Sequence, residues 1–421
     1  MYDWANSVYS LVITTTIFPI YYNAVTKNAF NSEIVHFFGI ELSNTVLYSY
    51  SLSFSFLLIA MLSPLLSGIA DFGGKKKAFM KFFTFLGGFS CIMLYFFTGA
   101  NIEFGIFFAA MASIGFAGSI VFYNAYLPII TTPENYDIVS AKGFSLGYAG
   151  SVILLVFNLI TISNPQWIGL SDESSATRLS FVLVGIWWIG FAQITFYYLP
   201  EEQHFKHNTI ELLKRGYQEI NKVFKSLSGL KHLKVFLISF FFYNMGVQTV
   251  LYLAALFGDK ELRLPAENLI ITILIIQLVA IGGSYIFAKI SKWKGNKVSL
   301  SIMVIIWIIV CAYAYFLNTA TQFYILGFFV GLVMGGIQSL SRATYSKLIP
   351  NETSNYTSYF SFYDVLEKMS IVLGTFVYGF VEQLTGSMRN STLALSSFFI
   401  IALIFLVTVK IPKAHSIATS N

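Results

Sequence analysis

Long apolar segments alternate with short polar ones along almost the whole chain. Each apolar segment is about as long as the roughly 20 residues that a helix needs to cross the hydrocarbon core of a bilayer. Twelve such segments follow one another, so the sequence predicts an all-α polytopic membrane protein with twelve transmembrane helices. We expect these helices at residues 5–24, 45–70, 78–98, 103–129, 141–163, 178–199, 233–257, 267–290, 297–317, 321–346, 358–382 and 391–411.

The composition agrees with a location in the membrane. Of the 421 residues, 56% are hydrophobic and only 11% are charged, whereas soluble proteins carry about 25% charged residues. Twelve crossings use roughly 240 residues, which leaves enough chain for short loops and one longer connection. Large domains outside the membrane are therefore excluded.

The basic residues are divided unevenly between the two sides of the predicted bundle. If the N-terminus is cytoplasmic, twenty of the 26 Lys and Arg residues fall in cytoplasmic segments, five fall outside, and Lys368 lies within a span. Cytoplasmic loops of membrane proteins are enriched in Lys and Arg. The net charge of +6 therefore reports topology rather than a nucleic-acid partner, and we expect both termini in the cytoplasm.

The longest polar stretch, residues 200–232, lies between the sixth and the seventh predicted spans. Its apolar residues recur at helical spacing opposite a basic face, which predicts an amphipathic helix at the cytoplasmic headgroup surface. We interpret the stretch as a linker rather than a binding domain. The apolar positions are Ile210, Leu213, Tyr217, Ile220 and Phe224.

This linker divides the chain into an N-terminal bundle of six helices, residues 1–199, and a C-terminal bundle of six helices, residues 233–421. A weak internal repeat supports the division, because Gly74 and Gly295 occupy matching positions after the second and the eighth spans. Two parallel six-helix repeats are a transporter architecture, with the substrate site at their interface. The fold class is therefore two pseudo-symmetric six-helix bundles.

Polar residues form stripes along single helix faces in several spans. In the first span they are separated by four, three and four positions, which confines them to an arc of about 60° at 100° per residue. Such a face meets water or substrate, although hydrogen bonding between helices is the alternative explanation for any one residue. The candidates for a substrate cavity are Asp3, Ser7, Ser10 and Thr14 in the first span, Asn124 in the fourth, Asn244, Gln248 and Tyr252 in the seventh, and Gln338, Arg342 and Tyr345 in the tenth.

Three charged residues, Asp364, Glu367 and Lys368, lie in the first turns of the eleventh span. A charge within a span costs about 2.5–3.5 kcal/mol on insertion scales, so such residues are usually paired or functional. Asp364 and Lys368 can pair at i and i+4, which leaves one carboxylate as a candidate for proton coupling. The alternative is an ionic cluster that closes a cytoplasmic gate.

The loop after the second span reads GIADFGGKKK. Its small residues allow close helix approach, and Asp71 can cap a neighbouring helix N-terminus, which we expect near Ser358 at the start of the eleventh span. The pattern resembles the loop signature of the major facilitator superfamily, and the resemblance implies a conformational gate. Lys292 stands where the second half would carry the Asp, so that copy is degenerate. The gate residues are Gly68, Asp71, Gly74, Lys75, Lys76 and Lys77.

Five further stretches are similar to the vacuole-effluxer branch of this superfamily, which includes an autophagy-related vacuolar amino-acid exporter. The resemblance covers nearly the whole chain and implies alternating access around a cavity lined by spans one, four, seven and ten, with amino-acid efflux as the activity. We expect membrane lipid and a small-molecule substrate as partners, with either proton coupling or facilitated diffusion as the mode of transport, and we expect a monomer. The stretches are YDWANSVYSLVITTTIFPIYY, VFYNAYLP, SAKGFSLGYAGS, FFYNMGVQT and GGIQSLSRATYSKLIP.

The short loops favour a bacterial cytoplasmic membrane over a vacuole. The chain begins directly at its Tyr-Asp-Trp motif, and the sequence leaves open whether a short tail precedes it. We expect no cofactor and no metal, because no cluster has metal-ligand spacing and no nucleotide-binding loop occurs. Two alternatives to a carrier remain: a transport-inactive sensor, and a membrane-embedded lipid-modifying enzyme, which lacks support because no nucleophile motif is present.

Overall fold

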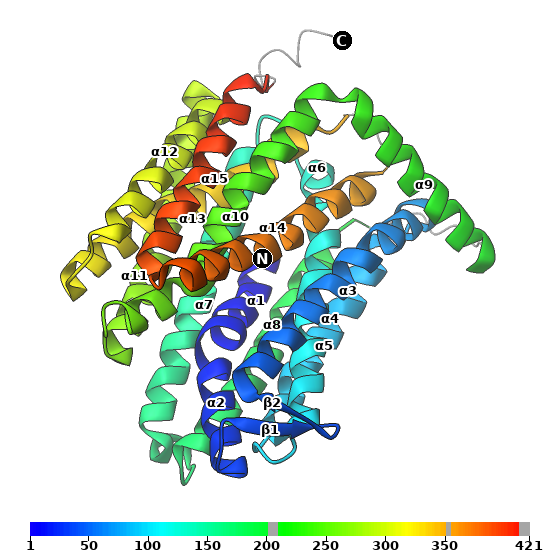
Figure 1. The fold of residues 1–421 in the computed structure, drawn as a ribbon. Coiled ribbons are helices and arrows are strands. Elements are labelled where there is room, and N and C mark those ends of the chain that lie inside the picture. Colours follow the sequence, from blue (N-terminus) through cyan, green and yellow to red (C-terminus); the bar gives the residue numbers. More distant parts are fainter. Residues whose placement is uncertain (201–208, 351–354, 412–421) are drawn as a thin grey trace.

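The computed structural model of the chain is helical over most of its length, and it describes residues 1–200, 209–350 and 355–411. The long helices run back and forth between two ends of the molecule (Figure 1). We call the end that carries α9 (Thr209–Gly229) the linker end. The opposite end, which carries the antiparallel hairpin of β1 (Ile34–Phe37) and β2 (Ile40–Ser43), is the hairpin end.

The remaining elements follow in chain order. The N-terminal half contains α1 (Tyr2–Val8), the π-helical segment η1 (Tyr9–Thr16), α2 (Ile17–Phe30), α3 (Asn44–Gly73), α4 (Lys76–Met93), η2 (Leu94–Phe96), α5 (Ile102–Asn124), α6 (Leu127–Ile130), α7 (Tyr136–Ser163), η3 (Pro165–Ile168) and α8 (Glu173–Tyr198). The C-terminal half contains α10 (Lys231–Lys260), α11 (Ala266–Lys294), α12 (Asn296–Tyr315), α13 (Ala320–Leu348), α14 (Tyr356–Thr385) and α15 (Met388–Thr408).

The predicted spans correspond to long helices. Within the described part of the chain, eleven helical segments are long and apolar enough to cross a membrane. The twelfth expected span is α14, which is 30 residues long and is more polar because it carries Asp364, Glu367 and Lys368. The chain therefore has the all-α, twelve-helix architecture that the hydropathy pattern predicts.

Each half of the chain has its own apolar core. One cluster of buried residues comes from the first eight helices and includes Trp188 and Phe181. The other comes almost entirely from α10 to α15 and includes Trp307 and Phe399, whose rings stack at 5.4 Å between centroids. The two halves of the chain are therefore packed around separate cores.

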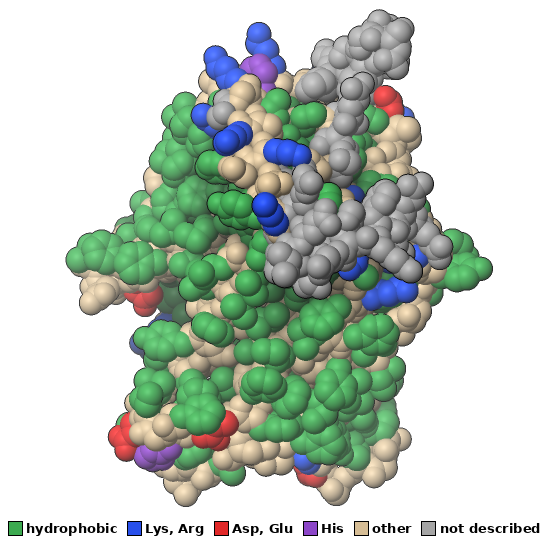
Figure 2. All heavy atoms as spheres, turned by 90° about the vertical axis from the view of Figure 1, so that its right-hand side faces the viewer, with side chains coloured by type: hydrophobic (Ala, Val, Ile, Leu, Met, Phe, Trp, Pro, Cys, Tyr) green, Lys and Arg blue, Asp and Glu red, His purple; other side chains and the backbone are tan. Residues whose placement is uncertain are grey.

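Basic side chains gather at the linker end. Figure 2 shows them around α9 and the neighbouring loops, whereas the middle of this face is mostly apolar, and acidic side chains lie at the hairpin end. Gly74 and Gly295, the matching glycines of the internal repeat, both adopt positive φ, +61° and +91°, at helix ends on this side. Most other residues are strained in that conformation, which explains why both halves use glycine there.

The linker contains the expected amphipathic helix. Its Gly216 packs against Gly68 of α3 so closely that a Cβ at Gly68 would lie 2.2 Å from the Gly216 carbonyl oxygen. Further along, the Ser226 hydroxyl is 2.8 Å from the Tyr359 hydroxyl of α14. The helix α9 therefore contacts both halves at the linker end. The side chains of Ile210 and Leu213 lie outside the described residues.

Glycines also let α11 and α13 approach closely. A Cβ at Gly283 of α11 would lie 2.1 Å from the backbone oxygen of Leu332, whereas a Cβ at the adjacent Gly282 would meet nothing within 4 Å. Overpacking of this kind typically costs about 1–3 kcal/mol. At an open helical position, alanine is instead favoured over glycine by up to about 1 kcal/mol.

We therefore expect Gly283→Ala to lower the apparent melting temperature of the purified protein. Gly282→Ala, the matched control one residue away, should leave it unchanged or raise it slightly. Thermal unfolding of both variants in detergent measures the difference. Equal melting temperatures would contradict the close approach of the two helices.

Candidate functional site

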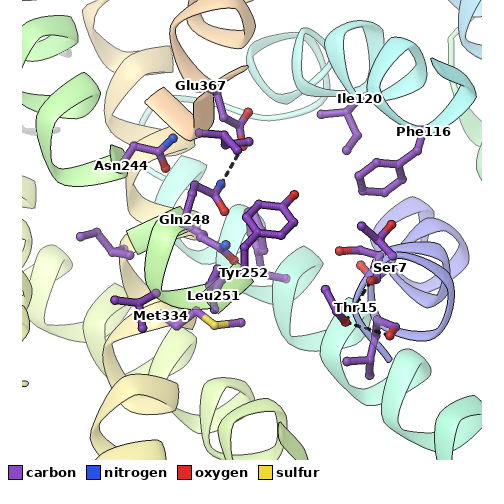
Figure 3. A pocket seen from close by; sticks show the side chains of 18 of the residues that line it. Ser7, Thr15, Phe116, Ile120, Asn244, Gln248, Leu251, Tyr252, Met334 and Glu367 are labelled. Atoms are coloured by element: carbon purple, nitrogen blue, oxygen red, sulfur yellow. Dashed lines mark hydrogen bonds between the residues drawn. The ribbon is translucent and has the colours of Figure 1, made fainter. Parts of the chain in front are cut away.

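A cavity of about 540 Å³ lies between the two bundles. Its walls come from α1, η1, α2, α3, α5 and α7 on one side and from α10, α11, α13 and α14 on the other, and Figure 3 shows the two walls facing each other. Ten of the eleven candidate cavity residues line it: Asp3, Ser7, Ser10, Thr14, Asn124, Asn244, Gln248, Tyr252, Gln338 and Arg342.

Tyr345 does not line the cavity, contrary to expectation. It lies nearly one helical turn closer to the linker end than Arg342, at a depth where the two halves of the chain are packed together. Its buried hydroxyl donates a hydrogen bond to the Tyr359 carbonyl oxygen at 2.6 Å. Its ring lies 5.1 Å and 5.0 Å from the rings of Phe360 and Tyr363. Tyr345 is therefore part of the packing beneath the cavity.

The first span changes from α-helix to π-helix where it meets the cavity. The segment η1 presents Ser10 and Thr14 to the cavity, and the Thr15 hydroxyl donates to the carbonyl oxygens of Ser10 and Leu11 at 3.2 Å and 2.9 Å. Pro19 follows four residues after Thr15 and has no N–H to donate to its carbonyl. The proline is the sequence signal for this break, which the helical spacing alone did not predict.

A network around Arg342 forms the part of the cavity nearest the linker end, which we call the cavity floor. Arg342 Nη2 lies 3.6 Å from Asp3 Oδ2, and this oxygen also accepts a hydrogen bond from the Tyr123 hydroxyl. Arg342 Nε donates to the Ser140 hydroxyl at 2.9 Å, and Nη1 donates to Asn124 Oδ1 at 3.3 Å. Arg342 belongs to the C-terminal half, and its partners Asp3, Ser140 and Asn124 belong to the N-terminal half, so the network joins the two halves.

The opposite wall carries the charged cluster of α14. Lys368 Nζ lies 2.8 Å from Asp364 Oδ1 and 3.8 Å from Glu367 Oε2. Gln248 Nε2 donates to Glu367 Oε1 at 3.3 Å, as the dashed line in Figure 3 shows. Glu367 and Lys368 line the cavity, whereas the Asp364 side chain is 1% exposed and lies behind them. The i, i+4 pair that the sequence predicted is present.

Asp71 caps the N-terminus of α14, as expected from the loop motif. Its carboxylate accepts hydrogen bonds from the backbone N–H groups of Thr357 and Ser358, at 3.2 Å and 2.7 Å, and from the Ser358 hydroxyl at 2.8 Å. Lys76 Nζ lies 3.3 Å from the same carboxylate. A carboxylate at a helix N-terminus is favoured by the exposed N–H groups and the helix dipole. This contact joins α3 to α14 at the linker end.

The other residues of the predicted gate surround this cap. Gly68 contacts α9, and Gly74 ends α3. Lys75 precedes α4, and Lys77 Nζ donates to the Leu199 carbonyl oxygen at 3.0 Å.

A second polar contact closes the linker end on the other side, and the sequence did not reveal it. Asp137, at the start of α7, pairs with Lys347 of α13 at 2.7 Å. It also accepts hydrogen bonds from Ser291 at 2.9 Å and Asn296 at 2.8 Å. The C-terminal half has no counterpart of Asp71 in its own loop. At this contact the carboxylate is Asp137 of α7, which belongs to the N-terminal half. Both side chains of the ion pair are at most 8% exposed.

These contacts make the two ends of the molecule different. The hydrogen bonds and ion pairs described between the two halves lie at the linker end or at mid-depth. The cavity lining, in contrast, continues toward the hairpin end through Pro19, Tyr48 and Gln277. The cavity is therefore closed toward the linker end.

A family of known proteins matches this chain. The model of the family described as "Vacuole effluxer Atg22 like" matches residues 1–419. The chain belongs to this family. An uncharacterized MFS-type transporter of Bacillus subtilis, YxiO, is 32% identical over 419 residues, which cover 97% of this chain and 93% of that protein. Autophagy-related protein 22 of Yarrowia lipolytica is 23% identical over 465 residues, which cover 89% and 76% of the two chains.

Solved structures show the same fold. The fucose transporter FucP in its outward conformation has a TM-score of 0.70 and 13% identity, with 98% of this chain and 99% of that chain covered. The proton:xylose symporter XylE has a TM-score of 0.71 and 12% identity, with 97% and 94% covered. This Atg22-like chain is therefore an MFS-type transporter with the major facilitator fold, an integral membrane protein, and not an enzyme.

Proposed function

We propose that this Atg22-like transporter carries amino acids through the cavity by alternating access. The observation that supports this most is the charge around the cavity, with Asp3 and Arg342 at the floor and Glu367 and Lys368 on the wall of α14. A small zwitterion complements such a lining, because each of its two charges finds an opposite charge of the protein nearby when it is buried. The volume of about 540 Å³ lies within the roughly 300–1,000 Å³ of small-molecule pockets.

In the proposed cycle, two units rock against each other around the cavity. The units are residues 1–199 and 233–421, with residues 200–232 as the linker between them. Asp71 and Asp137 hold the linker end shut in the state described here and release it in the opposite state. Glu367, with Asp364 and Lys368, is the proposed proton-coupling site, because Glu367 faces the cavity and has the longer contact with Lys368.

We place the linker end in the cytoplasm of a bacterial cell and the transporter, as a monomer, in its inner membrane. The support is the concentration of Lys and Arg at the linker end, since basic loops are retained in the cytoplasm. In this orientation the cavity faces outward, and amino-acid efflux requires a second state that opens at the linker end.

Counterflow in proteoliposomes tests the proposed substrate. Vesicles loaded with one of the twenty amino acids at a time should take up the same labelled amino acid for at least one of them, faster than vesicles without protein. Vesicles loaded with sugars or nucleosides serve as the specificity control. Exchange of only a sugar or a nucleoside would contradict the proposal. Stabilisation of the protein by an amino acid without any flux would favour the transport-inactive sensor.

Thiol labelling tests the orientation. Gln218 is exposed on α9 at the linker end, and Ser171 is exposed at the hairpin end, while the native Cys91 and Cys311 are buried. In intact cells we expect an impermeant thiol reagent to label Ser171→Cys readily and Gln218→Cys only after the cells are permeabilised. Ready labelling of Gln218→Cys from outside would reverse the topology.

A further inference from the structure

The Asp3–Arg342 pair differs from the other ion pairs of the structure in its position. It joins the two halves of the transporter, as the Asp137–Lys347 pair does, but it also lines the cavity. Both of its side chains are nearly buried, 9% exposed for Asp3 and 5% for Arg342. The separation of 3.6 Å between Nη2 and Oδ2 is longer than a hydrogen bond. The pair is therefore held mainly by charge, at the place where a solute in the cavity would reach it.

The Arg342 guanidinium forms its hydrogen bonds and ion pair with the N-terminal half. Besides its contacts with Asn124 and the Ser140 hydroxyl, its Nη2 donates to the Ser140 carbonyl oxygen at 3.3 Å. Its guanidinium carbon lies 4.6 Å and 5.2 Å from the ring centroids of Phe144 and Tyr123. Opening of the linker end requires α13 to move away from α1, α5 and α7, so Arg342 must break these contacts.

Withdrawal of Arg342 would leave two nearly buried charges, each without the opposite charge of the other. Breaking a buried ion pair is unfavourable because each charge keeps its desolvation cost and loses its attraction. A solute with only one charge can satisfy one side of the broken pair. An amino-acid zwitterion can satisfy both sides, since its ammonium group suits Asp3 and its carboxylate suits the fork of Arg342 donors.

We propose that an amino acid inserts its two charged groups between Asp3 and Arg342, and that this exchange of ion pairs releases the cavity floor. The inference rests on the proposed amino-acid substrate and adds the residues that select it. Gly143 lets the pair itself sit against α7, because a Cβ there would lie 2.2 Å from Asp3 Oδ2 and 3.1 Å from Arg342 Nη2. Phe144 contacts Arg342, and Met334 and Ile337 of α13 also line the cavity, so the lining suits a short aliphatic side chain.

Four probes with the same side chain test the two charges separately. L-valine carries both charges, and N-acetyl-L-valine lacks the ammonium group. Valinamide has an amide in place of the carboxylate, and isobutylamine lacks the carboxyl group altogether. The measurement is inhibition of valine counterflow by each probe, together with the thermal stabilisation that each probe gives. In the wild type, valine should compete far better than the other three. Each result is a ratio within one variant, so a lower yield of protein does not affect it.

The two single variants should change selectivity in opposite directions. In Asp3→Asn, the preference for valine over N-acetyl-L-valine should fall about tenfold or more, because the partner of the ammonium is lost. In Arg342→Gln, the preference for valine over valinamide should fall instead. The double variant Asp3→Asn, Arg342→Gln leaves no unpaired charge of this pair, which favours folding, and it should lose both preferences.

Asp137→Asn is the matched control. It weakens the other inter-half ion pair at the same end, outside the cavity, and should change the rate of exchange without changing the order of the probes. If Asp3→Asn and Arg342→Gln keep the wild-type preferences while still exchanging valine, the inference is wrong and the proposed function stands. If none of the four probes competes or stabilises in the wild type, the proposed amino-acid function fails for aliphatic substrates and the inference fails with it.

Discussion

Replacement of Asp71 by asparagine is expected to slow transport severalfold while the amount of folded protein stays the same. The Asp71 carboxylate accepts two backbone hydrogen bonds at the start of α14, and Lys76 lies 3.3 Å away. Asparagine preserves the size of the side chain but has no negative charge and only one acceptor oxygen. The variant therefore weakens a contact that, in the proposed cycle, forms only while the linker end is closed, and it leaves the core of each half intact.

Asp172→Asn is the control for this prediction. Asp172 caps α8 by accepting the Ser175 backbone N–H at 2.8 Å, so its chemistry matches that of Asp71. Hydrogen bonds from the backbone and the side chain of Ser175 hold the pKa of the Asp172 carboxyl below its ordinary value, and the side chain is ionised at neutral pH. The cap lies within one half, at the hairpin end, and its loss should leave the exchange rate near that of the wild type. An unchanged rate in Asp71→Asn would mean that the loop is only a topological signal.

The order of helices could be predicted because bilayer thickness imposes a length on every span. Even α14 was predicted as a span, because Asp364, Glu367 and Lys368 lie in its first turns and the rest of the helix is mostly apolar. The hairpin of β1 and β2 was missed. It lies in a short segment between two spans, where bilayer thickness sets no length, and its four-residue strands give little alternation to detect.

The cavity residues could be predicted to the extent that they repeat along one helix. Asn244, Gln248 and Tyr252 share a face through their spacing alone, and all three line the cavity. Contacts between distant segments leave no such trace. Asp137 and Lys347 are 210 residues apart, and each looks like an ordinary loop charge until the fold brings them together. Asp71 was the exception because a loop motif, rather than spacing, indicated its partner.

The cluster of α14 combines two carboxylates with one lysine, and the geometry distinguishes their roles. Lys368 forms its short contact with Asp364, at 2.8 Å, and this carboxylate is almost completely buried. Asp364 Oδ2 has no hydrogen-bond partner among the described residues. Glu367 is 24% exposed, lines the cavity and lies 3.8 Å from the lysine. Of the two carboxylates, Glu367 is therefore the one that is accessible from the cavity, which is why we propose it as the coupling residue.

Glu367→Gln is accordingly expected to abolish accumulation driven by a proton gradient and to preserve counterflow exchange, because exchange requires no net movement of protons. Asp364→Asn should reduce both activities together, since it removes the closer of the two carboxylates that pair with a buried lysine and leaves only the longer contact with Glu367. Proteoliposomes with and without an imposed pH gradient measure the two activities in the same preparation. If gradient-driven accumulation survives in the double variant Asp364→Asn, Glu367→Gln, protons are coupled elsewhere. If Glu367→Gln lowers accumulation and exchange equally, the cluster serves as a gate, because a gate limits every mode of transport whereas a proton site limits only the mode that moves protons.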